Sequence, residues 1–238
     1  MKPIIFSTQM IQAILSGNKT QTRRVIKPQP SDGLDFIQTD DNYAVFQKYE
    51  TSEDMIRIQL IKSRYLPGDI LWVRETFFCD ECLPNCPGRT DKDECPFNRI
   101  GDKCYGYKEQ YTYQTDIKWR PSIFMPKEAA RLFLQVTDVY PQKLQDITEQ
   151  DAKAEGAPSW FTVIDVKKET KYGVEYSIKN CPEEKKKYTT GFKILWDSIN
   201  AKRGYSFESD PWVWVISFRI DNQRQEQDNY EQHNKDQR

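Results

Sequence analysis

The most constraining feature of this sequence is the short segment 17–24, because it joins a predicted helix directly to a predicted strand. Thr8 can cap the N-terminus of that helix, and Gly17 can adopt the left-handed conformation that ends it. Between them, one helical stripe of apolar side chains is formed by Met10, Ile11, Ile14 and Leu15. The chain then continues in extended form, so the side chains at 20, 22 and 24 share one face.

The residues that follow Gly17 place cations beside a hydroxyl group. Thr22 and Arg24 point to the same side of the predicted strand, and Lys19 lies close to them at the exit of the helix. Such a group could form a small cationic wall of a binding pocket. A solvated basic turn has the same composition, and the spacing alone does not separate the two interpretations.

The pattern Gly17-x-Lys19-x-x-Thr22-x-Arg24 resembles the signature of the ASCH domain, a small β-barrel of the PUA-like superfamily. Two further segments match in the same order, 67–75 and 147–156. A longer, phage- and prophage-associated subfamily is similar at 20–28, 118–126 and 211–216. The resemblance spans about residues 1–220, with gaps. It implies an α+β fold, a PUA-like mixed β-barrel with a few flanking helices.

Length and charge limit the classes of function. The chain has 238 residues and a formal net charge of −1, so nucleic-acid binding would require a local basic patch. No apolar run reaches the roughly 18–20 residues that span a bilayer, and the N-terminus does not resemble a signal peptide. We therefore expect a cytoplasmic protein without membrane contact. Residues 221–238 carry almost no apolar side chains and are expected to be disordered. The oligomeric state stays open.

Local patterns predict the other strands and helices. Strands are expected at 4–6, 43–46, 57–61, 70–76, 132–139 and 212–220. A helix should run from a capping box of Thr148 and Asp151 to Gly156, and another should start at Phe192 with Thr190 as its cap.

Two pairs of neighbouring residues are candidates for ligand binding. Arg74 and Glu75 lie on opposite faces of their predicted strand, so only one of them can line a pocket. Trp119 and Arg120 could offer a stacking plane and a phosphate contact to a nucleotide. Alternatively, Trp119 packs in the core and Arg120 pairs with a carboxylate.

A cysteine-rich segment interrupts the barrel pattern at about 79–110 and is predicted to be an insertion. It carries five thiols: Cys79, Cys82, Cys86, Cys95 and Cys104. Four thiolates can hold one zinc ion in a closed, structural site, and the only histidine, His233, lies far away in the tail. An iron–sulfur cluster and reduced spectator thiols are the alternatives. Cys181 stands alone and is not expected to be a ligand.

Glu155 falls in the last turn of the predicted helix 148–156, at the negative end of the helix dipole. A carboxylate is disfavoured there, which suggests a functional role, although a surface ion pair with Lys153 would also explain it. In the ASCH resemblance, Glu155 matches an active-site glutamate of the family.

The resemblance implies two main functions. ASCH and other PUA-like proteins are associated with RNA or modified nucleosides, and the candidate contacts are Lys19, Arg23, Arg24, Glu75, Trp119, Arg120, Lys202 and Arg203. Some family members instead remove acetyl from acetylated cytidine. By that resemblance Lys19 is the general base, Thr22 the nucleophile and Glu155 the orienting or proton-shuttling group, with Arg23 and Arg24 lowering the pKa of Lys19. Ribonuclease activity and a phage accessory role through protein contacts are further alternatives.

Overall fold

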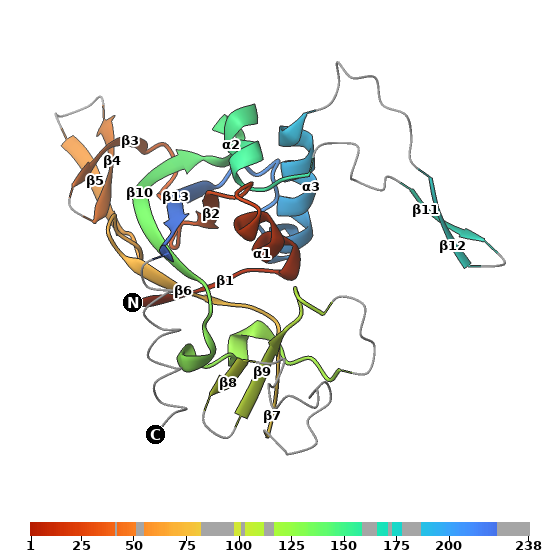
Figure 1. The fold of residues 1–238 in the computed structure, drawn as a ribbon. Coiled ribbons are helices and arrows are strands. Elements are labelled where there is room, and N and C mark those ends of the chain that lie inside the picture. The colour runs from red at the N-terminus through yellow and green to blue at the C-terminus, as the bar shows by residue number, and fades with distance from the viewer. Residues whose placement is uncertain are drawn as a thin grey trace, which may run out of the picture. The chain divides into compact units, whose positions relative to one another are not determined.

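The structure is a computed structural model that describes residues 1–40, 42–50, 55–81, 98–100, 103–111, 117–158, 166–170, 173–177 and 187–222. It is a mixed α+β protein dominated by strands, with three α-helices in its described part: α1 (Thr8–Leu15), α2 (Glu149–Ala154) and α3 (Tyr188–Asn200) (Figure 1). The chain divides into two compact units. The first consists of Met1–Ser16, Gly68–Val136 and Phe218–Arg238, and the second of Gly17–Pro67 and Thr137–Ser217.

The first unit contains two groups of strands. β1 (Lys2–Ile5) runs parallel to β6 (Ile70–Arg74), and β6 is antiparallel to the start of β10 (Phe133–Lys143). A separate small sheet has the order β7-β9-β8, with β7 at Phe77–Glu81, β8 at Asn98–Ile100 and β9 at Lys103–Tyr107. Two 3-10 helices follow, η1 (Ser122–Phe124) and η2 (Lys127–Ala129). The core shared by these strands and 3-10 helices includes Trp72, Phe77, Tyr105, Tyr107, Met125, Ala129, Ala130 and Phe133.

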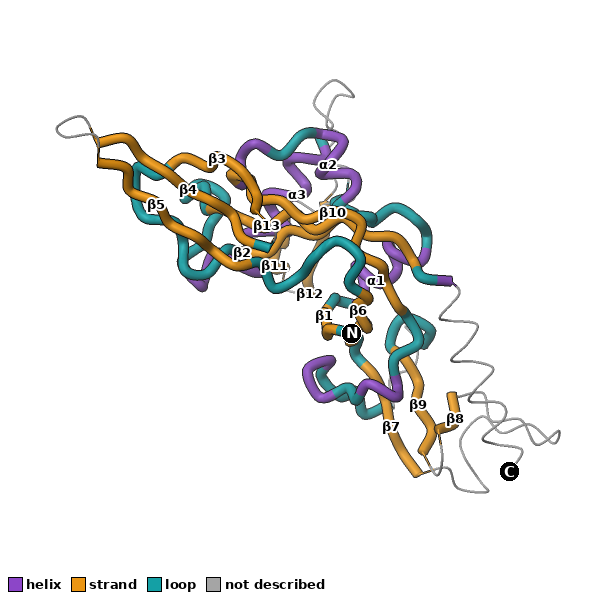
Figure 2. Tube along the Cα trace, turned by 90° about the vertical axis from the view of Figure 1, so that its left-hand side faces the viewer, coloured by secondary structure: helices purple, strands orange, loops and turns teal. Residues whose placement is uncertain are grey.

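The second unit is built on an antiparallel strand pair and a meander. β2 (Gln21–Val25) pairs with β13 (Trp212–Ile220), in a register that runs from Val25 opposite Val213 to Gln21 opposite Ser217. The meander has the order β3-β4-β5, with β3 at Asp35–Asp40, β4 at Tyr43–Glu50 and β5 at Met55–Lys62 (Figure 2). A two-stranded sheet joins β11 (Val166–Thr170) to β12 (Gly173–Ser177).

Helices of the second unit pack on a core of their own. The 3-10 helix η3 (Leu144–Asp146) precedes α2, and η6 (Ala201–Arg203) follows α3. Glu149, at the start of α2, accepts a hydrogen bond of 2.7 Å from the backbone N–H of Tyr188, and so ties α2 to the start of α3. The buried residues between these elements are Leu144, Ile147, Ala152, Ala157, Phe192, Trp196, Val213 and Val215.

The structure confirms the predicted α+β class, but the described strands do not close into the predicted barrel. The largest sheet has the open strand order β1-β6-β10-β13-β2. The predicted strand 212–220 is reproduced by β13, and the others occur with shifted ends. β10 continues to Lys143, four residues beyond the predicted end, which brings Gln142 into an ordered strand.

Two predicted helix caps are wrong. Ser7, not Thr8, is the N-cap of α1, and its Oγ accepts a hydrogen bond of 3.4 Å from the backbone N–H of Met10. α3 begins at Tyr188, and its first N–H groups are satisfied by Glu149 from another helix instead of by Thr190. A cap supplied by a distant carboxylate leaves no local signal in the sequence. The capping box of Thr148 and Asp151 is confirmed.

Several predictions fall on residues that the structure does not describe. They concern Cys82, Cys86, Cys95, Cys181 and the tail from residue 223 onwards. Within the described ranges, no helix has both the length and the apolar character needed to cross a membrane.

Candidate functional site

The candidate site lies in the second unit, where the residue before β2 meets the end of α2. Lys19 and Glu155 form an isolated antiparallel bridge, and the backbone N–H of Thr20 donates to the carbonyl of Ala154 at 2.8 Å. Gly17, with a φ of +74°, turns the chain toward this contact. The segment singled out in the sequence is therefore fixed against a helix end that lies more than 130 residues away.

Lys19 is a buried cation whose hydrogen-bonding capacity is filled. Its side chain is 0% exposed. The ammonium Nζ donates to Glu155 Oε2 at 2.8 Å, to the Glu155 carbonyl at 2.8 Å and to the Gln21 carbonyl at 2.7 Å. An ammonium group has three N–H donors, so each has an acceptor. This geometry fits the protonated form of Lys19.

Arg23 approaches the same carboxylate from β2. Its Nη1 donates to Glu155 Oε1 at 3.2 Å and its Nη2 donates to Gln142 Oε1 at 3.0 Å. Asp151 lies 3.5 Å from the same Nη2, and the guanidinium sits 5.8 Å from the centre of the Phe192 ring. One carboxylate thus has a buried cation on each of its oxygens. We call Lys19, Arg23 and Glu155 the buried ion network.

The network explains why Glu155 is tolerated at the C-terminal end of α2. A carboxylate at the negative end of a helix dipole is unfavourable by itself. Here Lys19 contacts both the carboxylate and the terminal carbonyl of the same residue, so one cation offsets both negative groups. The sequence alternative, a surface pair between Glu155 and Lys153, is wrong, because the partners are buried.

Burial dominates the titration of Lys19. Removal from water lowers the pKa of Lys19 from its ordinary value of 10.5, and Glu155 opposes this through its charge and its hydrogen bond. Arg24 and Arg23 lower the pKa further, as the sequence predicted, but they are the smallest of the causes.

A second group of cations gathers around Arg24. Burial lowers the pKa of this guanidinium, Tyr65 and Glu155 raise it, and the charges of Arg203 and Arg64 lower it. Arg64 and Arg203 are exposed on the loop after β5 and on η6, whereas Arg24 is partly buried on β2. We call Arg24, Arg64 and Arg203 the arginine cluster. Because both exposed arginines act on Arg24, positive charge is concentrated around this residue.

Thr22 belongs to the same unit, and the strand pairing of β2 defines its place. It lies on β2 opposite Ile216 of β13 and is 4% exposed. Sequence reasoning missed Gln142 and Arg64 as neighbours of these cations. Gln142 was placed beyond the predicted strand end, and Arg64 stands in a loop without a motif.

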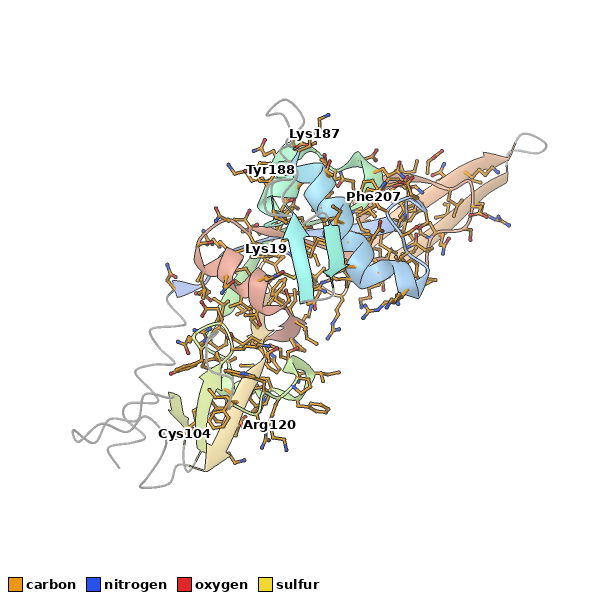
Figure 3. The ribbon with its side chains drawn as sticks, turned by 90° about the vertical axis from the view of Figure 1, so that its right-hand side faces the viewer. Lys19, Cys104, Arg120, Lys187, Tyr188 and Phe207 are labelled. Atoms are coloured by element: carbon orange, nitrogen blue, oxygen red, sulfur yellow. The ribbon has the colours of Figure 1, made fainter. Side chains whose placement is uncertain are left out.

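The other predicted ligand contacts lie in the first unit. Arg131 holds the buried carboxylate of Glu75 with two bonds of 2.9 Å, and its Nη2 also donates to Glu109. The guanidinium carbon of Arg74 lies 4.6 Å from the centre of the Trp72 ring. Trp119 is half-buried, and Arg120, which is labelled in Figure 3, is exposed. The structure therefore joins Lys19, Arg23 and Glu155 by direct contacts, and Glu75, Trp119 and Arg120 take no part in those contacts.

Cys79 and Cys104 face opposite sides of the small sheet. In the register of β7 and β9, Cys79 is opposite Tyr105 and Cys104 is opposite Asp80. Residues directly opposite each other share a face, and consecutive residues alternate, so the two sulfurs point apart. Cys79 packs on the core that contains Tyr105, whose pKa is raised to about 12 by burial and by Cys79. Among the described residues, no group of three or more metal-ligating side chains occurs.

No family model matches this chain, and neither a curated protein nor a solved structure matches it. The assignment to the ASCH domain therefore stays a prediction from the sequence.

Proposed function

We propose that this protein binds RNA or a modified nucleoside through the arginine cluster, with the buried ion network as its support. The observation that carries the proposal is that the charges of Arg64 and Arg203 both act on Arg24, in a chain of net charge −1. Planar guanidinium groups bind phosphate through paired hydrogen bonds, and they stack on bases. A phosphate-bearing nucleoside supplies both kinds of partner.

The two groups of cations have different roles in this proposal. The side chains of Lys19 and Arg23 are fully buried and bonded to protein acceptors, so they hold β2 against the end of α2. Arg24 is half-buried, and it is the expected phosphate contact. Arg64 and Arg203 add long-range attraction for a polyanion.

Titration calorimetry with nucleoside monophosphates, the matching nucleosides and a short single-stranded RNA tests the proposal. Arg24→Ala should weaken the binding of phosphate-bearing ligands by about 10- to 100-fold. This corresponds to the loss of one charged hydrogen-bonding group, which contributes roughly 1.5–3 kcal/mol. The salt dependence of RNA binding should fall by about one charge. Arg57→Ala is the matched control, because Arg57 is an exposed arginine on β5 in the same unit. Equal binding by wild type and Arg24→Ala would contradict the proposal.

Hydrolysis of acetylated cytidine is the second candidate, and the direct contact of Lys19 with Glu155 favours it. The resemblance assigns these two residues to one reaction centre, and they meet although 136 positions separate them. A general base must be neutral, and burial shifts the pKa of Lys19 in the required direction. However, Lys19 could accept a proton from Thr22 only after releasing one of its three acceptors.

Thr22→Val separates the enzyme from the binder, because it keeps the shape and removes the hydroxyl group. For a nucleophilic Thr22, the variant should bind acetylated cytidine and lose turnover by several powers of ten. For a binding site, wild type and variant both lack turnover, and affinity changes by only about 0.5–1.5 kcal/mol. Incubation of wild type with labelled RNA tests for ribonuclease activity. A wild type that neither binds nor processes these ligands would leave an accessory role through protein contacts.

We also propose a structural zinc site in the cysteine-rich segment and a divergent PUA-like fold in a cytoplasmic protein. The thiol spacing supports the metal, and the opposed directions of Cys79 and Cys104 limit the ligand set. One zinc ion can use only one of these two thiols, so Cys79→Ser and Cys104→Ser should differ in bound metal. Equal loss in both variants would contradict that limit, and metal analysis that finds neither zinc nor iron would refute the site.

A further inference from the structure

The loop formed by residues 118–127, in the first unit, presents apolar side chains to solvent. Phe124 is 71% exposed and Ile123 is 58% exposed, and Phe124 is the most exposed large apolar side chain among the described residues. Neither residue belongs to the arginine cluster or to the buried ion network. We call residues 118–127 the aromatic loop.

The aromatic loop is firmly anchored on both sides of these side chains. The backbone of Arg120 exchanges two hydrogen bonds with Phe77, of 2.7 and 3.2 Å. Met125 is fully buried, and its sulfur accepts the backbone N–H of Glu75 at 3.3 Å. Between these anchors, the 3-10 helix η1 closes through the N–H of Phe124 and the carbonyl of Pro121 at 3.1 Å. The fold therefore holds the Phe124 ring outward in a fixed turn.

Cations flank the exposed ring in the sequence. Lys118, Arg120 and Lys127 are all exposed, and among the described residues close in sequence the one exposed carboxylate is Glu128. The aromatic loop and its next residue therefore have a local charge of +2, although the whole chain has a net charge of −1. A ligand that suits this surface carries several negative charges and flat apolar faces together.

Single-stranded nucleic acid has that combination, because its unpaired bases expose their faces between phosphates. A duplex hides the faces of its bases, so it could use only the cations. A lipid surface binds amphipathic segments with a broad apolar face, and two apolar side chains on one 3-10 turn provide little such area. Charge complementarity and the single protruding ring both favour the single strand.

We propose that the aromatic loop binds single-stranded nucleic acid, with Phe124 stacked on a base and Lys118, Arg120 and Lys127 contacting phosphates. This surface belongs to the first unit and the arginine cluster to the second, and the proposal does not rest on the function proposed for the cluster. RNA and DNA share the required chemistry. Stacking on a ring tolerates any base, so we expect weak sequence preference.

Fluorescence anisotropy with labelled oligouridylate, oligodeoxythymidylate and a duplex of the same length tests the proposal. Phe124→Ala should weaken both single strands by roughly 5- to 150-fold and leave duplex binding unchanged, whereas Phe124→Trp should preserve single-strand binding. Arg120→Ala should weaken binding to single strand and duplex alike and lower the salt slope by about one. Ile58→Ala is the matched control, because Ile58 is 57% exposed on β5 and should change nothing.

The outcomes separate this inference from the proposed function. If Arg24→Ala weakens binding of the single strand and Phe124→Ala does not, the proposal for the aromatic loop is refuted and the proposal for the arginine cluster stands. The opposite result supports the loop and counts against the cluster. A wild type that binds none of the three oligonucleotides refutes the loop. Phe124-dependent sedimentation with vesicles of phosphatidylcholine and phosphatidylglycerol, without oligonucleotide binding, would identify a lipid contact in its place.

Discussion

Replacing Glu155 with glutamine keeps the shape of the side chain and removes the negative charge that Lys19 and Arg23 share. Both cations are 0% exposed at their side chains and Glu155 is 6% exposed, so water screens the contacts poorly. Breaking a buried ion pair by removing one partner costs about 3–5 kcal/mol, because the other charge stays buried. Lys19 keeps two carbonyl acceptors, and Arg23 keeps Gln142 and Asp151. We therefore expect a loss near the lower end, about 3 kcal/mol.

Urea unfolding followed by tryptophan fluorescence measures this loss, since Trp196, Trp212 and Trp214 all lie in the second unit. Glu149→Gln is the control on the same helix. Glu149 is exposed and caps α3, so its variant should lose only about 0.5–2 kcal/mol.

A double-mutant cycle tests whether the loss comes from the network. Lys19→Met should be destabilising alone and should cost less when Glu155→Gln is present, with a coupling of roughly 0.5–3 kcal/mol. A Glu155→Gln variant within about 1 kcal/mol of wild type, or a coupling of zero, would refute the reasoning that the buried ion network holds β2 against α2.

Two further predictions concern pH and packing. The folded-state pKa of Lys19 lies below its ordinary 10.5, so the cost of keeping it charged is present below the folded pKa and is relieved as pH rises toward 10.5. The stability of wild type relative to Lys19→Met should therefore rise across that alkaline window in urea unfolding, and a fall would contradict the direction. Gly191→Ala should destabilise by about 1–3 kcal/mol, although alanine favours helices, because its Cβ would lie 2.0 Å from the Pro158 carbonyl oxygen. Thermal unfolding compares this variant with Gly204→Ala, whose added Cβ has no atom within 4 Å. Gly204→Ala should cost only about 1–2 kcal/mol, because the φ of residue 204 is +85°. An unchanged unfolding midpoint for Gly191→Ala would show that Pro158 can move.

The local features of this protein were predictable because they depend on neighbours in the chain. The capping box of Thr148 and Asp151 needs three consecutive peptide units, and the helix end at Gly17 needs a residue that tolerates a positive φ. The alternation of 212–220 gave β13 with both ends correct. Where a distant group replaced a local one, as when Glu149 capped α3, the prediction failed.

The partners of the charged residues were decided only by the tertiary structure. Sequence spacing placed Thr22 and Arg24 on one face, but it could not show that Lys19 and Arg23 share the carboxylate of Glu155. It also left open the partner of Glu75, which proved to be Arg131, and the opposite directions of Cys79 and Cys104. An ion pair depends on distances set by strand register and helix position, and these are fixed by burial across the whole unit. The sequence alone determined which charges are available, and the fold determined which of them are buried in pairs and which remain accessible to a ligand.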